Sequence, residues 1–173
     1  MRLLTLILLL TSYNLISQEI KRIDSDSSSI NYSGKHFLHK WSAENTNISG
    51  LVNVEDENIV NIGVIAKVAD FKSGNSSLDS NALRVLEALQ FPNIIFKSVN
   101  IDNQNKELQI DGLIEFHGIE KNISVIAELT KIDDMYRLNG EFTINLSNFL
   151  IERPSLLLRK IDDEIFIKFN LFY

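Results

Sequence analysis

The sequence predicts an all-β fold, an antiparallel barrel with one short helix, and three observations support this prediction. Hydrophobic residues alternate with polar ones along several stretches of the chain, as in strands with one buried face. These stretches recur at short intervals and are separated by polar turns. Helical spacing of hydrophobic residues is found at residues 79–89. Because long strands with open edges invite aggregation, a closed barrel fits better than a sandwich.

The first half of the chain contains a polar leader at residues 18–28 and a predicted first strand at 29–33. Trp41 and Ala43 then alternate with polar residues, but the hydrophobic residues that follow have the opposite parity. Since one strand face cannot carry both sets, we expect a turn or bulge near residues 45–47. The clearest strand of this half alternates Val60, Ile62, Val64, Ala66 and Val68.

The predicted helix covers residues 79–89, with Ser77 or Asp79 as its N-terminal cap. Pro92 stops it and an alternating strand begins at once. A single helix among strands is interpreted as a cover packed on the sheet. The strands after it are predicted from the alternating sets Ile94–Phe96–Ser98, Leu108–Phe116, Ile123–Leu129, Leu138–Leu146 and Ile165–Leu171.

Composition limits the function. The formal net charge is −6, so the basic field that attracts nucleic acid is missing. Cysteine is absent, which excludes disulfides, thiolate chemistry and cysteine-ligated metals. A domain without disulfides must be stabilised by its core, and 45% hydrophobic residues are enough to build one.

Residues 1–17 are predicted to be a signal peptide, with Arg2 before a short apolar run at 3–10. Cleavage after Ser17 would leave one domain at residues 18–173, with no stable membrane span, in a bacterial periplasm. An uncleaved N-terminal anchor is the alternative. The oligomeric state, including a homodimer, is left open.

Catalytic and metal-binding patterns are weak. His36 and His39 are three residues apart, which in an extended segment places them on opposite faces, and His117 is distant in sequence. The pairs Asp133–Asp134 and Asp162–Asp163 are typical of hairpin turns. Phosphate-binding, dinucleotide-binding and nucleophile motifs are absent from the sequence. We therefore expect a non-enzymatic protein without cofactor or metal.

Four segments, in order, resemble the YceI-like family of lipocalin-like exported proteins associated with polyisoprenoid binding. They are Ser29–Tyr32 with Lys35-His36, Phe91–Ser98, Gly112–Lys121 and Leu146–Ile151. The resemblance implies an extended antiparallel eight-stranded barrel with an internal apolar channel, no catalytic residues and no metal. One departure concerns the family's Asp-x-His before the helix: Asp79 is present here, but the histidine is not.

The leading hypothesis is an exported protein that sequesters or carries a long apolar, polyisoprenoid-like ligand inside the barrel. One strand parity and the helix supply the expected ligand-binding residues: Val64, Ala66, Leu83, Leu86, Ile94, Phe96, Ile114, Phe116 and Ile144. The same residues could instead fill a packed core. Two alternatives stay open: a periplasmic stress or interaction module with a filled barrel, and a lipid hydrolase or isomerase with His36 or His117 as base.

Overall fold

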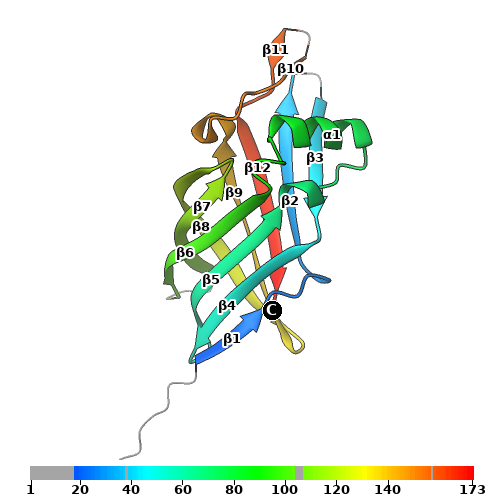
Figure 1. The fold of residues 1–173 in the computed structure, drawn as a ribbon. Coiled ribbons are helices and arrows are strands. Elements are labelled where there is room, and N and C mark those ends of the chain that lie inside the picture. Colours follow the sequence, from blue (N-terminus) through cyan, green and yellow to red (C-terminus); the bar gives the residue numbers. More distant parts are fainter. Residues whose placement is uncertain (1–17, 38, 104–106, 157) are drawn as a thin grey trace, which may run out of the picture.

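A curled antiparallel sheet of ten strands makes up most of the molecule (Figure 1). The structure is a computed structural model that describes residues 18–37, 39–103, 107–156 and 158–173, so the predicted signal peptide at 1–17 lies outside it. The strands of the sheet are β1 (Gln18–Arg22), β2 (Ser29–His36), β3 (His39–Asn45), β4 (Ile48–Glu55), β5 (Asn58–Lys67), β6 (Asn93–Asp102), β7 (Glu107–Phe116), β8 (Ile119–Ile132), β9 (Met135–Asn145) and β12 (Glu164–Phe172). The all-β class is confirmed.

The remaining elements gather mostly at one end of the sheet. They are η1 (Val68–Asp70), α1 (Ser76–Val85), η2 (Leu146–Phe149) and the small hairpin of β10 (Ser155–Leu156) and β11 (Arg159–Lys160). We call the end that carries α1 and the β10–β11 hairpin the mouth end, and the end with β1 and the C-terminus the packed end (Figure 1). Within the described ranges, no helix is long and apolar enough to cross a bilayer.

The sheet has ten strands instead of the expected eight; a kink accounts for one extra strand and β1 for the other. The strand order is β1-β4-β5-β6-β7-β8-β9-β12-β2-β3. Only Thr46 and Asn47 separate β3, which pairs with β2, from β4, which pairs with β5. One long bent strand is therefore counted twice, and β1 adds another. Because the edge strands β1 and β3 do not pair with each other, the sheet is a curled half-barrel rather than the closed barrel we expected.

Partly buried hydrogen bonds hold the kink, which lies where a turn or bulge was predicted, near residues 45–47. The Asn45 side chain is fully buried; its amide nitrogen donates to the carbonyl of Lys67, and its oxygen accepts from the backbone N–H of Asn47. Just before the kink, Glu44 and Lys72 exchange two backbone hydrogen bonds. These contacts join β3 to the segment that follows β5, where the sheet curls back on itself.

The leader predicted at residues 18–28 was wrong in its first part, because β1 forms there. This strand pairs antiparallel with β4, from Gln18 opposite Glu55 to Arg22 opposite Leu51. As an edge strand it presents mostly polar side chains to solvent, and even Ile20 is 63% exposed. Because neither face of this strand is buried, its hydrophobic and polar residues do not alternate, and the sequence gives no sign of a strand.

Helix α1 begins and ends earlier than the predicted 79–89. Asn75 caps it, its side-chain oxygen accepting from the backbone N–H groups of Ser77 and Leu78. Asp79, expected as a cap, instead accepts two hydrogen bonds from Ser73. At the other end, Glu87 has a φ of 46°, which is incompatible with a continuing helix. Pro92 therefore marks the start of β6, not the end of the helix.

Two hydrophobic clusters lie inside the curl. One fills the packed end around Ile48, Val52, Ile59 and Leu138, all almost completely buried. The other lies toward the mouth end and includes Phe116, Ile144, Leu146, Phe149 and Ile151. In the first cluster, Ile48, Val52 and Ile59 belong to a close-packed core, whereas Val64, Ala66, Leu138 and several other members face an internal cavity. Most of the second cluster faces the same cavity.

Candidate functional site: an apolar cavity

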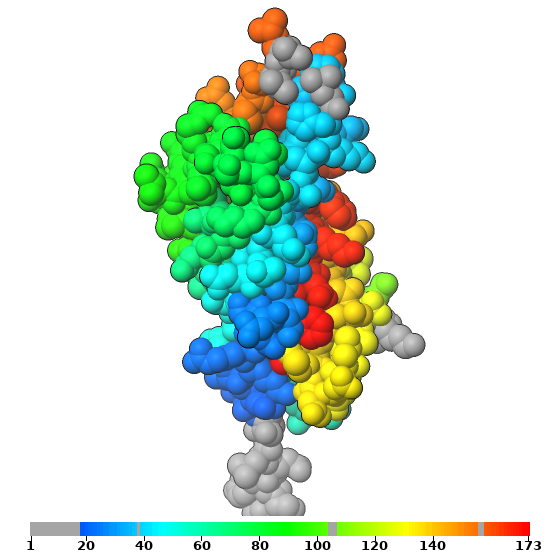
Figure 2. Space-filling view, turned by 90° about the vertical axis from the view of Figure 1, so that its right-hand side faces the viewer, coloured from blue at the N-terminus to red at the C-terminus, as the bar shows by residue number. Residues whose placement is uncertain are grey.

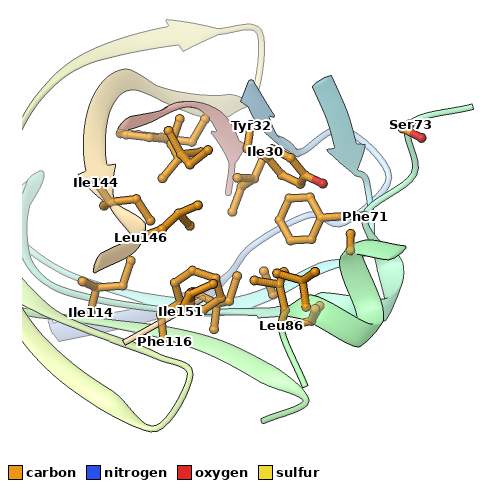
Figure 3. A pocket seen from close by; sticks show the side chains of 18 of the residues that line it. Ile30, Tyr32, Phe71, Ser73, Leu86, Ile114, Phe116, Ile144, Leu146 and Ile151 are labelled. Atoms are coloured by element: carbon orange, nitrogen blue, oxygen red, sulfur yellow. The ribbon is translucent and has the colours of Figure 1, made fainter. Parts of the chain in front are cut away.

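A cavity of about 430 Å³ opens at the mouth end and runs down inside the curled sheet (Figure 3). Its walls come from eight of the ten strands, from α1, and from the irregular segment between β9 and β12. Most of the lining side chains are aliphatic or aromatic. A volume of this size is typical of small-ligand sites.

Strand register builds the wall in rows. Val64 on β5 is directly opposite Phe96 on β6, and Phe96 is directly opposite Ile114 on β7. Because alternate residues of a strand point to the same face, residues two positions away repeat this row along the cavity. Ala66 opposite Ile94 forms the next row. Curling of the sheet turns these rows inward.

All nine residues predicted to bind a ligand line the cavity. Seven come from strands and two, Leu83 and Leu86, from the helical segment. Figure 3 shows Leu86, Ile114, Phe116 and Ile144 around the same space. Sequence parity thus identified one wall correctly; that these side chains contact a ligand stays a prediction.

The opposite wall escaped the sequence analysis. Ile30 and Tyr32 from β2, Trp41 from β3 and several residues of β12 also line the cavity. Their alternation was visible, but only the pairing of β12 with both β9 and β2 shows that they face the strands β5 to β7. Ile151 and Ile161 lie in irregular chain and had no periodic signal at all.

Two glycines let aromatic rings lie against the wall instead of across the cavity. A Cβ on Gly112 would lie 2.5 Å from the Phe96 ring and 2.5 Å from the backbone oxygen of Lys97. A Cβ on Gly34 would lie 2.3 Å from the ring of Trp41, its cross-strand partner. Each ring occupies the space that a side chain would need. The lumen between them therefore stays open.

Polar groups gather where the cavity meets α1. Tyr32, Ser73, Asp79 and Asn81 belong to its lining. Two hydrogen bonds from Ser73, from its hydroxyl and its backbone N–H, lower the pKa of Asp79, so this carboxyl is ionised at neutral pH. Burial, and to a lesser degree the charge of Asp79, raise the pKa of Tyr32, whose phenol stays neutral.

The histidines do not form a catalytic arrangement. Nε2 of His117 lies 2.9 Å from a Glu87 carboxylate oxygen and its Nδ1 lies 3.0 Å from the Phe149 carbonyl, but neither His117 nor Glu87 lines the cavity. His36 does line the cavity and is 3% exposed, and its Nε2 lies 3.3 Å from the carbonyl of Arg159. The His117 contacts join three turns near the mouth end, and the His36 contact joins β2 to β11. Across the residues placed by the structure, no group of three metal-ligating side chains comes together.

The fold is shared with solved structures of low sequence identity. Burkholderia cenocepacia BcnA superposes with a TM-score of 0.79 at 17% identity, covering 87% of this chain and 99% of that one. A polyisoprenoid binding domain from Saccharophagus degradans, implicated in plant cell wall breakdown, gives 0.72 at 13% identity, with 91% and 98% covered. A Campylobacter jejuni YceI protein gives 0.62 at 17%, with 73% and 80% covered.

The comparison with curated proteins finds no match. The sequence of residues 22–173, however, matches the model of the YceI-like domain, which is all of the curled sheet except most of β1. This match spans most of the chain and contains all four segments that carried the resemblance. The chain therefore belongs to the YceI-like domain family.

Proposed function

We propose that this protein sequesters or carries a long apolar lipid of the polyisoprenoid type inside the cavity, without catalysis. The observation that carries the proposal is the cavity itself, about 430 Å³ with a predominantly hydrophobic lining. Membership of the YceI-like family and the similarity to a polyisoprenoid binding domain support this ligand class. The proposal places the protein in the periplasm, since residues 1–17 have the pattern of a signal peptide.

A hydrophobic lining agrees with a ligand whose binding free energy comes from burying a long hydrocarbon chain. Each methylene removed from water contributes about 0.8 kcal/mol. Ten such groups would give roughly 8 kcal/mol before the cost of ordering the chain. Such a chain would lie beside Ile114 and Phe142, and the described lining residues around these two on β7 and β9 are hydrophobic, without an acid and a base side by side. Binding and release are what these walls can do.

The alternative of an interaction module with a filled barrel is not favoured, because the cavity is open. A hydrolase or isomerase is disfavoured by the histidine contacts. His117 binds Glu87 away from the cavity, and no hydrogen bond or ion pair between described residues joins His36 to a carboxylate.

The direct test is to purify the protein from its native host, extract any bound lipid with organic solvent and identify it by mass spectrometry. A second measurement is the uptake of added polyprenol by the lipid-free protein. A matched pair of variants gives the control. Ala66→Phe adds a ring to the cavity, whereas Ile65→Phe adds one on the outer face of the same strand, where Ile65 is exposed.

We expect Ala66→Phe to reduce uptake at least tenfold and Ile65→Phe to leave it unchanged. Ala82→Phe, on the helical side of the cavity, is a second obstruction if Ala66→Phe does not fold. No bound lipid together with no uptake by the wild-type protein would overturn the proposal, as would equal uptake by all variants.

A further inference from the structure

Two neighbouring hairpins project at the mouth end, and each has an exposed hydrophobic side chain near its tip. One is formed by β2 and β3, the other by β10 and β11; Figures 1 and 2, turned by 90° from each other, both show them at this end. They are joined by a hydrogen bond from the backbone N–H of Asp162 to the carbonyl of Lys35. His36 connects them again through its contact with Arg159. The two hairpins therefore lie against each other and form one continuous surface.

The tips present hydrophobic side chains to water. Phe37, after β2, is half exposed, and Leu158, before β11, is fully exposed. Leu158 also has a φ of 65°, in the left-handed region that is unfavourable for a leucine. A leucine at this position is therefore favoured neither by burial of its side chain nor by its backbone conformation. An exposed apolar tip in a strained turn is better explained by what it touches.

The charged residues within the two hairpin segments are all basic. Segments 34–40 and 155–160 contain Lys35, Lys40, Arg159 and Lys160 and no acidic residue, in a chain of net charge −6. All four basic side chains are exposed. The Arg159 guanidinium lies 4.7 Å from the centre of the Phe37 ring, so charge and apolar surface are adjacent. In sequence, Glu152 precedes the second hairpin and Asp162 and Asp163 follow it; Asp163 is bound by Ser147 and Arg153.

The cavity opens at the same surface. His36, His39, Ser155 and Ile161, all from or beside the two hairpins, belong to its lining. An apolar ligand that entered here directly from a bilayer would not have to cross water. Entry of a lipid ligand from the bilayer rests on the proposed function, but contact of the hairpins with the bilayer does not.

We propose that the two hairpin tips dock the mouth end onto an anionic lipid bilayer, Phe37 and Leu158 entering the headgroup region while Lys35, Lys40, Arg159 and Lys160 bind phosphates. Exposed aromatic and aliphatic side chains beside lysine and arginine are the elements of an interfacial anchor. The acidic charge on the remainder of the protein opposes adsorption of other faces. Docking therefore orients the cavity toward the membrane.

Cosedimentation with vesicles tests the docking, using protein from which lipid has been extracted. The vesicles are phosphatidylcholine alone or phosphatidylcholine with phosphatidylglycerol. The apolar variant is Phe37→Ser with Leu158→Ser, and the charge variant is Lys40→Gln with Lys160→Gln. The matched control is Val99→Ser with Ile126→Ser, which removes two exposed hydrophobic residues from the outer faces of β6 and β8.

We expect wild-type protein and control to bind the anionic vesicles at least tenfold more strongly than the neutral ones, and binding to weaken as salt rises. Both tip variants should lose at least tenfold in binding while melting at the wild-type temperature. Equal binding by tip variants and control, equal binding to both vesicles, or none to either would overturn the proposal. In the last case, the partner of the tips would be a protein.

Polyprenol uptake from detergent separates the two proposals. If uptake fails while vesicle binding holds, the proposed function is wrong and the docking stands. If uptake from detergent holds while vesicle binding fails, the docking is wrong and the cavity still binds its ligand.

Discussion

The packed end and the mouth end belong to one sheet but differ in what fills the space between their strands. At the packed end, Ile48, Val52 and Ile59 are at most 1% exposed, belong to the hydrophobic core and do not line the cavity. At the mouth end, Ile144 and Phe116 are also buried, but they face the cavity. The same alternating pattern therefore supplies stability at one end and a binding space at the other. Each of the following predictions tests this division.

The largest expected effect is that of Ile59→Ala at the packed end. Ile59 is 0% exposed and does not line the cavity. Loss of its side chain should decrease the free energy of unfolding by about 3–4 kcal/mol, because the neighbours cannot collapse into the gap. Urea unfolding measures it.

Ile144→Ala is the matched change at the mouth end. One side of Ile144 already faces empty space, so fewer contacts are lost, and the expected decrease is about 1–2 kcal/mol. Equal losses at the two positions would show that the cavity is filled in solution.

The expected effect of Asn45→Ala lies between those of Ile59→Ala and Ile144→Ala. It removes the two partly buried hydrogen bonds at the kink and leaves the Lys67 carbonyl and the Asn47 N–H without their partner. We expect a loss of about 2–3 kcal/mol in the free energy of unfolding, measured by urea denaturation. Asn31→Ala removes an exposed hydrogen bond to Glu44 and should cost well under 1 kcal/mol, about the size of other surface changes. A result in the opposite order would mean that the kink does not depend on Asn45.

Gly112→Ala should reduce lipid binding with a smaller effect on stability. The new Cβ must displace the Phe96 ring and the strand beside it, and the ring can move only into the cavity. We expect a loss of about 1–2 kcal/mol in stability and a several-fold loss in uptake. Gly63→Ala is the control, because the nearest atom to its Cβ would be the Phe96 oxygen at 4.0 Å. Its uptake should equal that of the wild type.

The smallest predicted effect is a change in stability with pH. The hydroxyl and backbone N–H of Ser147, with Arg153 contributing less, hold the pKa of Asp163 below its usual value of 3.8. The ionised form is therefore stabilised in the folded protein. Its contribution is present above the unfolded pKa and is lost as pH falls below about 4 through the folded pKa. Thermal unfolding from pH 6 to pH 2 should show a shallower acid decline for Asp163→Asn than for Asp162→Asn.

Features of the fold that depend on residues close together in the sequence were predicted well, and features that depend on distant residues were not. Period-two parity placed Val64, Phe96 and Ile114 on one wall, because strand geometry alone determines which face they share. It missed β1, since an edge strand with no buried face has no pattern. The cap of α1 was assigned to Ser77 or Asp79 because both have suitable side chains; in the structure Asn75 is the cap, and Asp79 is bound by Ser73.

Most of the cavity residues that the sequence did not predict lie on the opposite wall, formed by β2, β3 and β12. Tyr32 and Trp41 reach the cavity only because β2 pairs with β12 at the other end of the chain, and no local pattern encodes that pairing. Sequence resemblance predicted the barrel-like class and the presence of a channel. It could not predict the two hairpin tips, whose significance lies in their position relative to each other.

The pairing of β2 with β12 also has a consequence for the order of folding. Ile30 is opposite Phe169, so this seam joins residues that are among the most distant in the chain. Contacts between distant residues form late and slow the folding of β proteins. The hairpins of β6 to β9 are local and can form first. The binding space would then be the last part of the molecule to exist, created in the step that completes the fold.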